Sequence, residues 1–206
     1  MEFRSALKER LKGPLPGRAA QLQMAAYAGR LSFDAPENPL RAAVLLLLHG
    51  QGPDHKTILI ERVSHDQDKH SGQISFPGGK LDECDETLEA CALREAHEEI
   101  GVIQEKIEVL GRLTDLYIPV SGFMVTPVVG VIDRLDALTP QPTEVAEILE
   151  VPLSMFFSQQ TRQIRDLAIP NGIILRNVPY FDVYGKVLWG ATAMMMNEFI
   201  QIVEDL

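Results

Sequence analysis

The sequence predicts a mixed α+β fold with one central, acidic helix. Short apolar runs bounded by Gly or Pro recur along the chain, as buried strands do. Residues 86–100 instead combine helix-favouring residues with many glutamates. The chain has 206 residues, of which 46% are hydrophobic and 23% are charged. This size and composition suit one domain with a substantial core.

Helical patterns open the chain. Apolar residues recur at helical spacing from Phe3 to Leu11, and residues 18–29 are rich in Ala, Gln, Leu and Met. We therefore expect two short helices there. They belong to an N-terminal helical segment, residues 1–38, which we expect to pack on a main domain of residues 39–206.

Strands and a last helix follow. Apolar, β-branched and aromatic runs predict strands at residues 41–50, 56–63, 72–76, 106–113, 123–132 and 172–184. A Pro-Gly-Gly turn breaks the third of these strands. Residues 189–206 return to helical spacing. We interpret the three consecutive methionines in this segment, residues 194–196, as core residues.

Net charge and cysteine content disfavour several classes of protein. A net charge of −10 would repel nucleic acids and anionic membranes. No apolar run approaches the roughly 18 residues of a membrane span. Cys84 and Cys91 are too few for a disulfide framework, so we expect free thiols. The N-terminus lacks the apolar core of a signal peptide. We expect a cytoplasmic protein, and leave open whether it forms a homodimer.

The central helix carries most of the negative charge. Residues 80–105 hold nine acidic and two basic residues. Asp82 or Asp85 can cap a helix over residues 86–100, and Gly101 follows where a left-handed residue commonly ends a helix. The charge has two interpretations, a solvated helix face or a carboxylate cluster that binds a cation.

Three glutamates favour the cation site. Glu95, Glu98 and Glu99 are spaced so that they project to one side near the helix C-terminus. Like charges repel there, and the helix end is itself partially negative. Arg94 alone cannot offset three carboxylates, whereas divalent cations can, and oxygen ligands favour Mg²⁺ or Mn²⁺. The glycines at 78–79 would let a backbone carbonyl approach an ion or a phosphate closely.

The same stretch resembles the signature of the Nudix hydrolases, G-x5-E-x7-R-E-U-x-E-E-x-G-U with U aliphatic. Residues 94–102 match its second half at every defined position, with Ala96 as a small U. One extra residue separates Gly79 from Glu86, and this longer loop is usual in the coenzyme A pyrophosphatase branch of the family. Further stretches resemble that branch, namely residues 72–79, 121–130, 144–153 and 189–193.

The resemblance implies an α/β/α sandwich around a mixed sheet and a metal-dependent hydrolysis of nucleoside diphosphate derivatives. It implies Glu95 and Glu99 as the principal metal ligands, with the Gly78 carbonyl as a further donor. Glu98 would be a supporting ligand or a base. Arg94 would orient the glutamates, through Asp85 or Glu86.

Residues outside the nine-residue match complete the predicted site. Glu144 is a candidate for a base or ligand supplied by another loop, and a plain surface glutamate is the alternative. His97 occupies a free position of the signature, so we interpret it as a surface residue. For substrate binding we predict Arg62, Gly79 and Lys69. Arg62 matches an upstream pattern of the coenzyme A branch, in which Lys69 or His70 would replace a missing second arginine.

Three functions remain open on the sequence alone. The first is hydrolysis of coenzyme A or its thioesters to adenosine 3′,5′-bisphosphate and (acyl-)4′-phosphopantetheine. The second is hydrolysis of another substrate, such as ADP-ribose or NADH. The third is a Nudix-like ligand sensor, which the retained glutamates and the lack of room for a DNA-binding domain after the sandwich disfavour.

Overall fold

Two long strands form the centre of the sheet in the computed structural model, which describes residues 2–26, 34–50, 55–63, 72–169 and 172–206. Strands β1 (Leu40–His49) and β7 (Phe123–Ile132) pair in parallel over all ten residues. The other pairings of this sheet are antiparallel. They bring in β2 (Lys56–Arg62), β3 (Ile74–Ser75), β4 (Gly78–Lys80), β5 (Ile107–Arg112), β6 (Leu116–Ile118) and β8 (Val145–Pro152). The sheet is therefore mixed.

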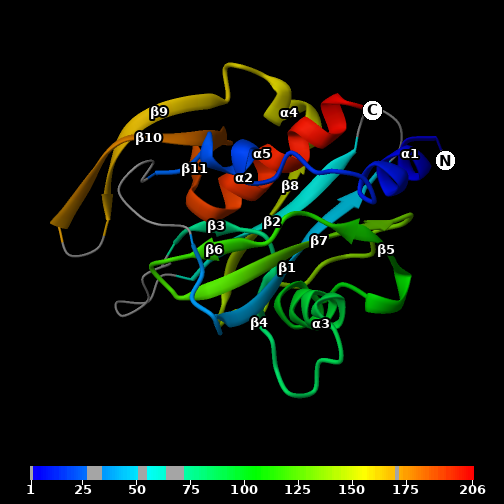
Figure 1. Ribbon diagram of the computed structural model, residues 1–206. Helices are drawn as coiled ribbons and strands as arrows, with labels where there is room; N and C mark the ends of the chain where they lie inside the picture. Colours follow the sequence, from blue (N-terminus) through cyan, green and yellow to red (C-terminus); the bar gives the residue numbers. More distant parts are fainter. Residues whose placement is uncertain (1, 27–33, 51–54, 64–71, 170–171) are drawn as a thin grey trace.

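Helices cover both faces of this sheet. Successive side chains of the central strand β1 point to opposite faces, and because both sets are apolar, both faces need to be covered. Ala43, Leu45 and Leu47 of β1 pack toward α3 (Leu88–Ile100). Leu46 and Leu48 belong to the core on the opposite face. That second core is covered by α1 (Glu2–Arg10), α2 (Gly17–Leu22) and α5 (Gly190–Glu204). Figure 1 shows α3 and α5 on opposite sides of the sheet.

A smaller antiparallel sheet lies beside α5. It consists of β9 (Arg162–Ile169), β10 (Ile173–Val183) and β11 (Lys186–Trp189), and β11 leads directly into α5. The far ends of β9 and β10 project from the rest of the protein (Figure 1). A short helix, α4 (Leu153–Phe157), connects β8 to this sheet, and a 3-10 turn, η2 (Gln104–Lys106), precedes β5.

The N-terminal helices share the core of the sheet. Leu7 of α1 and Met24 after α2 are buried in the same cluster as Phe199 of α5. Glu198, also on α5 and fully buried, accepts hydrogen bonds from the Gly17 backbone N–H and the Gln21 side chain. The division into segments 1–38 and 39–206 stays a prediction.

The α+β prediction is confirmed, and several local predictions need correction. The central helix begins at Leu88, and its N-cap is Thr87, whose hydroxyl accepts from the Ala90 N–H at 3.1 Å, in place of Asp82 or Asp85. The strand expected at 72–76 is only two residues long, and pairing with β1 returns at Gly78. Helix α4 and the strands β4, β6, β8, β9 and β11 were not predicted from the sequence.

The remaining predicted elements are present with shifted ends. The second helix ends at Leu22, well before residue 29. The last helix begins at Gly190, because the preceding Trp189 pairs with Tyr180 in the smaller sheet. Its three consecutive methionines are buried, as predicted, with 4%, 2% and 0% of their surface exposed.

Candidate active site

Helix α3 brings its glutamates to the edge of the central strands. Its buried side includes Ala92 and Ala96, whose small side chains let the helix lie close to β1. Glu99 continues this buried stripe and is only 2% exposed. Gly101 ends the helix in the left-handed conformation, with φ of 70°, as predicted.

Arg94 links α3 to the loop before it. Its Nε and Nη2 atoms donate to the Asp85 carboxylate at 2.9 and 2.8 Å. Hydrogen bonding to this guanidinium lowers the pKa of Asp85 to about 2. The Nη1 atom lies 2.9 Å from Glu95 and 3.2 Å from Glu98. Of the two acidic partners that the sequence left open, Asp85 is therefore the one that makes these contacts.

Glu99 is a buried carboxylate with an incomplete set of partners. It accepts a hydrogen bond from the Gly78 N–H at 2.8 Å and lies 3.3 Å from Arg62 Nη1. Burial raises its pKa to about 7, against the lowering effects of these two partners. The charges of Glu95 and Glu144 raise this pKa further, which shows that the carboxylates share one region.

Glu95 lies against the glycine turn. Burial raises the pKa of Glu95, Arg94 opposes this shift, and Glu98 and Glu144 add to it. A Cβ atom at Gly79 would lie 2.4 Å from the Glu95 carboxyl carbon, so a side chain there would displace the carboxylate. At Gly78, where φ is 153°, a Cβ would lie 2.4 Å from the Ala43 carbonyl oxygen. Gly79 therefore allows the Glu95 carboxylate to approach the turn, and Gly78 allows the turn to approach β1.

Glu144 reaches the same region from a different part of the chain. The loop before it donates hydrogen bonds to the C-terminal carbonyls of α3, from Thr139 to Ile100 at 3.0 Å and from Gln141 to Glu99 at 2.8 Å. These bonds satisfy carbonyls that have no partner within the helix. The Glu144 carbonyl in turn accepts from the Val63 N–H, directly after β2. The loop therefore holds the exposed Glu144 side chain beside the glutamates of α3.

Comparisons with known proteins agree with this geometry. The family model of the NUDIX domain matches residues 38–168. This chain belongs to the Nudix hydrolase family. The uncharacterized Nudix hydrolase NudL of Photorhabdus laumondii is 36% identical over 185 residues, which cover 89% of this chain and 94% of that protein. NudL of Pectobacterium atrosepticum is 38% identical over 150 residues, covering 72% of this chain and 76% of that one.

Solved structures show the same fold. A Nudix hydrolase from M. smegmatis, RenU, has a TM-score of 0.51 at 19% identity and covers 81% of this chain and 88% of its own. The α/β/α sandwich that the resemblance implied is therefore confirmed. As a Nudix hydrolase, the protein is an enzyme that cleaves phosphorus anhydride bonds in small nucleoside diphosphate substrates.

Nudix hydrolases generally use divalent metal ions, and the donor chemistry here fits such an ion. Glu95, Glu98, Glu99 and Glu144 supply carboxylate oxygens, the ligands that hard divalent cations prefer. Within the described part of the chain, no three His, Cys, Asp or Glu side chains converge closely enough to hold an ion as they stand. Arg62 and Arg94 instead contact several of these carboxylates. Burial raises the pKa of Glu95 and of Glu99, and the neighbouring carboxylates add to this effect, although Arg94 and Arg62 oppose it.

A cavity that the sequence analysis did not anticipate opens beside these residues. It has a volume of about 630 Å³, and Arg62, Gly78 and Gly79 all line it. Much of its wall comes from α5 and from the segment between β6 and β7, which lie far from the glycine turn in the sequence. The match of residues 121–130 and 189–193 to one branch of the family was the only sequence signal for this wall.

Four other residues were singled out in the sequence, namely His97, Cys84, Cys91 and Lys69. His97 is exposed, as predicted, and its Nδ1 lies 2.9 Å from the Val102 carbonyl oxygen, a contact that closes the end of α3. Cys84 and Cys91 are free, which confirms that prediction. Lys69 lies outside the described residues. In the described ranges, no helix is long and apolar enough to cross a membrane.

Proposed function

We propose that this Nudix hydrolase cleaves the diphosphate of coenzyme A or its thioesters to adenosine 3′,5′-bisphosphate and (acyl-)4′-phosphopantetheine. The character of the cavity supports this proposal most strongly. Arg62 and Lys80 are the charged side chains among the described residues that line it, and both are basic. Most of the remaining wall is apolar. A substrate with an anionic diphosphate and a long, weakly polar arm matches these two parts.

The alternative substrates match the cavity less well. ADP-ribose and NADH carry hydroxyl-rich sugars on both sides of the diphosphate. Burying a hydroxyl without a partner costs roughly 1–3 kcal/mol, so such a sugar needs several hydrogen-bonding groups around it. The wall formed by Met194, Met195 and Phe123 offers none from its side chains. The pantetheine arm carries its two amides and its hydroxyl along an aliphatic chain, so its methylene and methyl groups can lie along such a wall.

The site residues then take the following roles. Glu95 and Glu99, with Glu98 and the Gly78 carbonyl, would hold the divalent ion, Mg²⁺ or Mn²⁺. When bound, the ion neutralises charge on the diphosphate and lowers the pKa of water. Arg94 positions Glu95 and Glu98 through the contacts described above.

Residues from three other segments complete the proposed site. Glu144 would accept a proton from the attacking water as general base. Arg62 lines the cavity and would bind a substrate phosphate, as would the backbone at Gly79. Lys69 keeps the substrate-binding role that its sequence position suggests. A cytoplasmic location is part of the same proposal, and the oligomeric state, monomer or homodimer, stays open.

Product analysis tests this proposal. The purified protein should convert coenzyme A to adenosine 3′,5′-bisphosphate and 4′-phosphopantetheine in the presence of Mg²⁺ or Mn²⁺. Separating the products by chromatography and mass spectrometry identifies the bond that breaks. If the protein cleaves ADP-ribose or NADH at least tenfold more efficiently than coenzyme A and its thioesters, the substrate assignment is wrong and the broader family activity stands.

A further inference from the structure

The N-terminus of α5 opens into the cavity. Gly190, Ala191 and Thr192 form the first turn of this 15-residue helix, and all three line the cavity. The first N–H groups of a helix have no acceptor within it, and this end of a helix is partially positive. The N-cap residue, Trp189, makes no side-chain capping hydrogen bond, and the first turn contains no acidic residue. The end of α5 therefore presents hydrogen-bond donors to the cavity.

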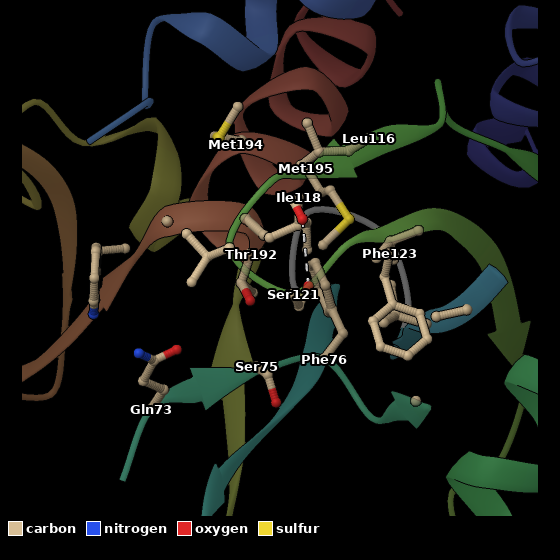
Figure 2. Close-up of a pocket in the computed structure, with 18 of the residues that line it drawn as sticks. Gln73, Ser75, Phe76, Leu116, Ile118, Ser121, Phe123, Thr192, Met194 and Met195 are labelled. Carbon is tan, nitrogen blue, oxygen red and sulfur yellow. Dashed lines mark hydrogen bonds between the residues drawn. The ribbon is translucent and has the colours of Figure 1, made fainter. Parts of the chain in front are cut away.

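Thr192 adds a hydroxyl that is without a partner in the described part of the chain. Its residue surface is only 7% exposed, and a buried hydroxyl without a hydrogen bond is costly. The unpaired hydroxyl oxygens of Thr57 and Ser75 are fully enclosed, whereas that of Thr192 reaches the cavity surface. Figure 2 shows this oxygen directed away from α5, into the space that Gln73 borders from the opposite side. The hydroxyl and the helix end therefore face the same space.

A phosphate group fits this set of donors. Backbone N–H groups at a helix N-terminus bind anionic oxygens well, and a hydroxyl supplies a further donor. Gly190 adopts φ of 64°, and a Cβ atom built there meets no atom within 4 Å, so the space beside the first turn is open. Strand β11, which leads into α5, contacts β3, and Gly78 follows three residues after the end of β3. The open space is therefore close to the glycine turn.

We propose that the N-terminus of α5 binds the substrate phosphate that carries the pantetheine arm, through its first N–H groups and the Thr192 hydroxyl. This inference rests on the proposed function and assigns one phosphate of the diphosphate to a site. Met194 and Met195 follow Thr192 on α5 and line the same cavity, so an arm that starts at this phosphate continues along the apolar wall. Arg62 and Gly79 remain for the phosphate on the adenosine side.

Binding of 4′-phosphopantetheine in the absence of Mg²⁺ tests this assignment separately from hydrolysis. The compound contains no phosphorus anhydride, and omitting Mg²⁺ prevents its phosphate from binding through a metal ion. Isothermal titration calorimetry should show that it binds about tenfold more tightly, or better, than pantetheine, which lacks the phosphate. Thr192→Val should weaken binding of 4′-phosphopantetheine about tenfold, as expected for loss of a hydrogen bond to a charged group, and leave pantetheine unchanged. Thr192→Ser keeps the hydroxyl and should restore most of the affinity.

Thr57 provides a matched control. Its hydroxyl is also buried and unpaired with respect to the described residues, but it lies on β2 and does not line the cavity. Thr57→Val should therefore leave both affinities unchanged. Neither valine substitution leaves a hydrogen-bond partner unsatisfied, so both variants should fold, and thermal unfolding by circular dichroism checks this.

The outcomes separate this inference from the proposed function. If coenzyme A is cleaved but Thr192→Val binds 4′-phosphopantetheine as tightly as the unsubstituted protein, the inference is wrong and the proposed function stands. If Thr192→Val weakens binding of adenosine 3′,5′-bisphosphate instead, α5 binds the nucleotide part, and the assignment to the pantetheine arm is overturned. If 4′-phosphopantetheine binds with the expected dependence on Thr192 but neither coenzyme A nor a thioester is cleaved, the phosphate site stands and the proposed reaction is wrong.

Discussion

Glu99 and Glu198 are two buried glutamates on opposite sides of the sheet, and their surroundings differ in one decisive way. Glu198 accepts from four neutral donors, with distances of 2.6 to 3.2 Å, contributed by Gly17, Gln21 and the backbone and side chain of Thr114. Glu99 accepts from one backbone N–H and one guanidinium and shares its region with Glu95 and Glu144. The first carboxylate is satisfied by the fold, whereas the second retains oxygen atoms for a further partner.

The comparison shows that burial of an acidic residue does not by itself mark a functional site. Both glutamates are at most 2% exposed. A carboxylate that is fully hydrogen-bonded stabilises the structure around it. A buried carboxylate that lies beside others and has few donors is destabilising, and such groups are concentrated at active sites.

The largest effect is expected from Glu99→Gln. The amide keeps an oxygen for the Gly78 N–H but removes the charge with which Glu99 is proposed to bind the metal, so kcat should fall by about 10²-fold or more. The melting temperature should stay the same or rise, because an incompletely paired buried charge is removed. Steady-state kinetics at saturating Mg²⁺ and thermal unfolding by circular dichroism measure the two effects. A variant with nearly normal kcat would remove Glu99 from the metal site.

Glu198→Ala should give the opposite pattern. It leaves buried donors of Gln21 and Thr114 without an acceptor, so the free energy of unfolding should fall by about 2–4 kcal/mol. The kcat of the folded protein at 25 °C should be unchanged, since this residue does not line the cavity. Urea unfolding measures the loss, and Glu204→Ala, at the exposed end of the same helix, is the control. A loss of kcat without a loss of stability would contradict the structural role of Glu198.

Asp85→Asn sharpens the comparison at the border of the site. The folded-state pKa of Asp85 is about 2, below its usual 3.8, so its ionised form stabilises the fold above about pH 4. This stabilisation is lost as the pH falls from about 4 to about 2. Asp85→Asn should therefore cost on the order of 1 kcal/mol at pH 7, after allowance for solvent screening.

The pH dependence is the specific test of that ion pair. Urea unfolding of Asp85→Asn and of the unsubstituted protein at pH 7 and at pH 3 should show a smaller difference between them at pH 3. A difference that is constant with pH would mean that the loss comes from packing and not from the Asp85 charge.

The smallest effect is expected from His97→Ala. His97 is exposed and contacts a backbone carbonyl after α3, away from the cavity. Both kcat and KM should stay within about twofold of the unsubstituted values, because surface substitutions are usually close to neutral. A large fall in kcat would show that His97 takes part in the reaction, although it occupies a position where the family signature allows any residue.

The sequence predicted that three glutamates of the candidate site lie together on one helix. Glu95, Glu98 and Glu99 are three and four residues apart, and helical geometry alone brings such residues to one side. The place of Glu144 depends on hydrogen bonds between its loop and the end of α3, which no local pattern encodes. Thr87 was missed as the helix cap because two aspartates nearby were also good candidates, and one of them, Asp85, is paired with Arg94 instead.

The missed strands and the structural glutamate have different causes. Strand β9 has a largely exposed surface and a mixed polar sequence, so it lacks the apolar run on which the strand predictions depended. Glu198 stands next to Asn197 in an otherwise apolar stretch of α5, and both side chains are fully buried. That pair of polar residues was a signal that the sequence analysis did not use. Identifying its partners would have required knowledge of how α2 packs on α5.

The contact between Gly17 and Glu198 also constrains the order in which the protein can fold. These two residues are 181 positions apart, so this contact of α2 can form only after α5 has left the ribosome. The central parallel pair has a similar requirement, because β1 must wait for β7. Native contacts between distant parts of a chain form slowly, and the apolar strand β1 stays unpaired on that side meanwhile. Folding of this enzyme should therefore be limited by these long-range contacts, and early strands such as β1 are exposed to aggregation until their partners are made.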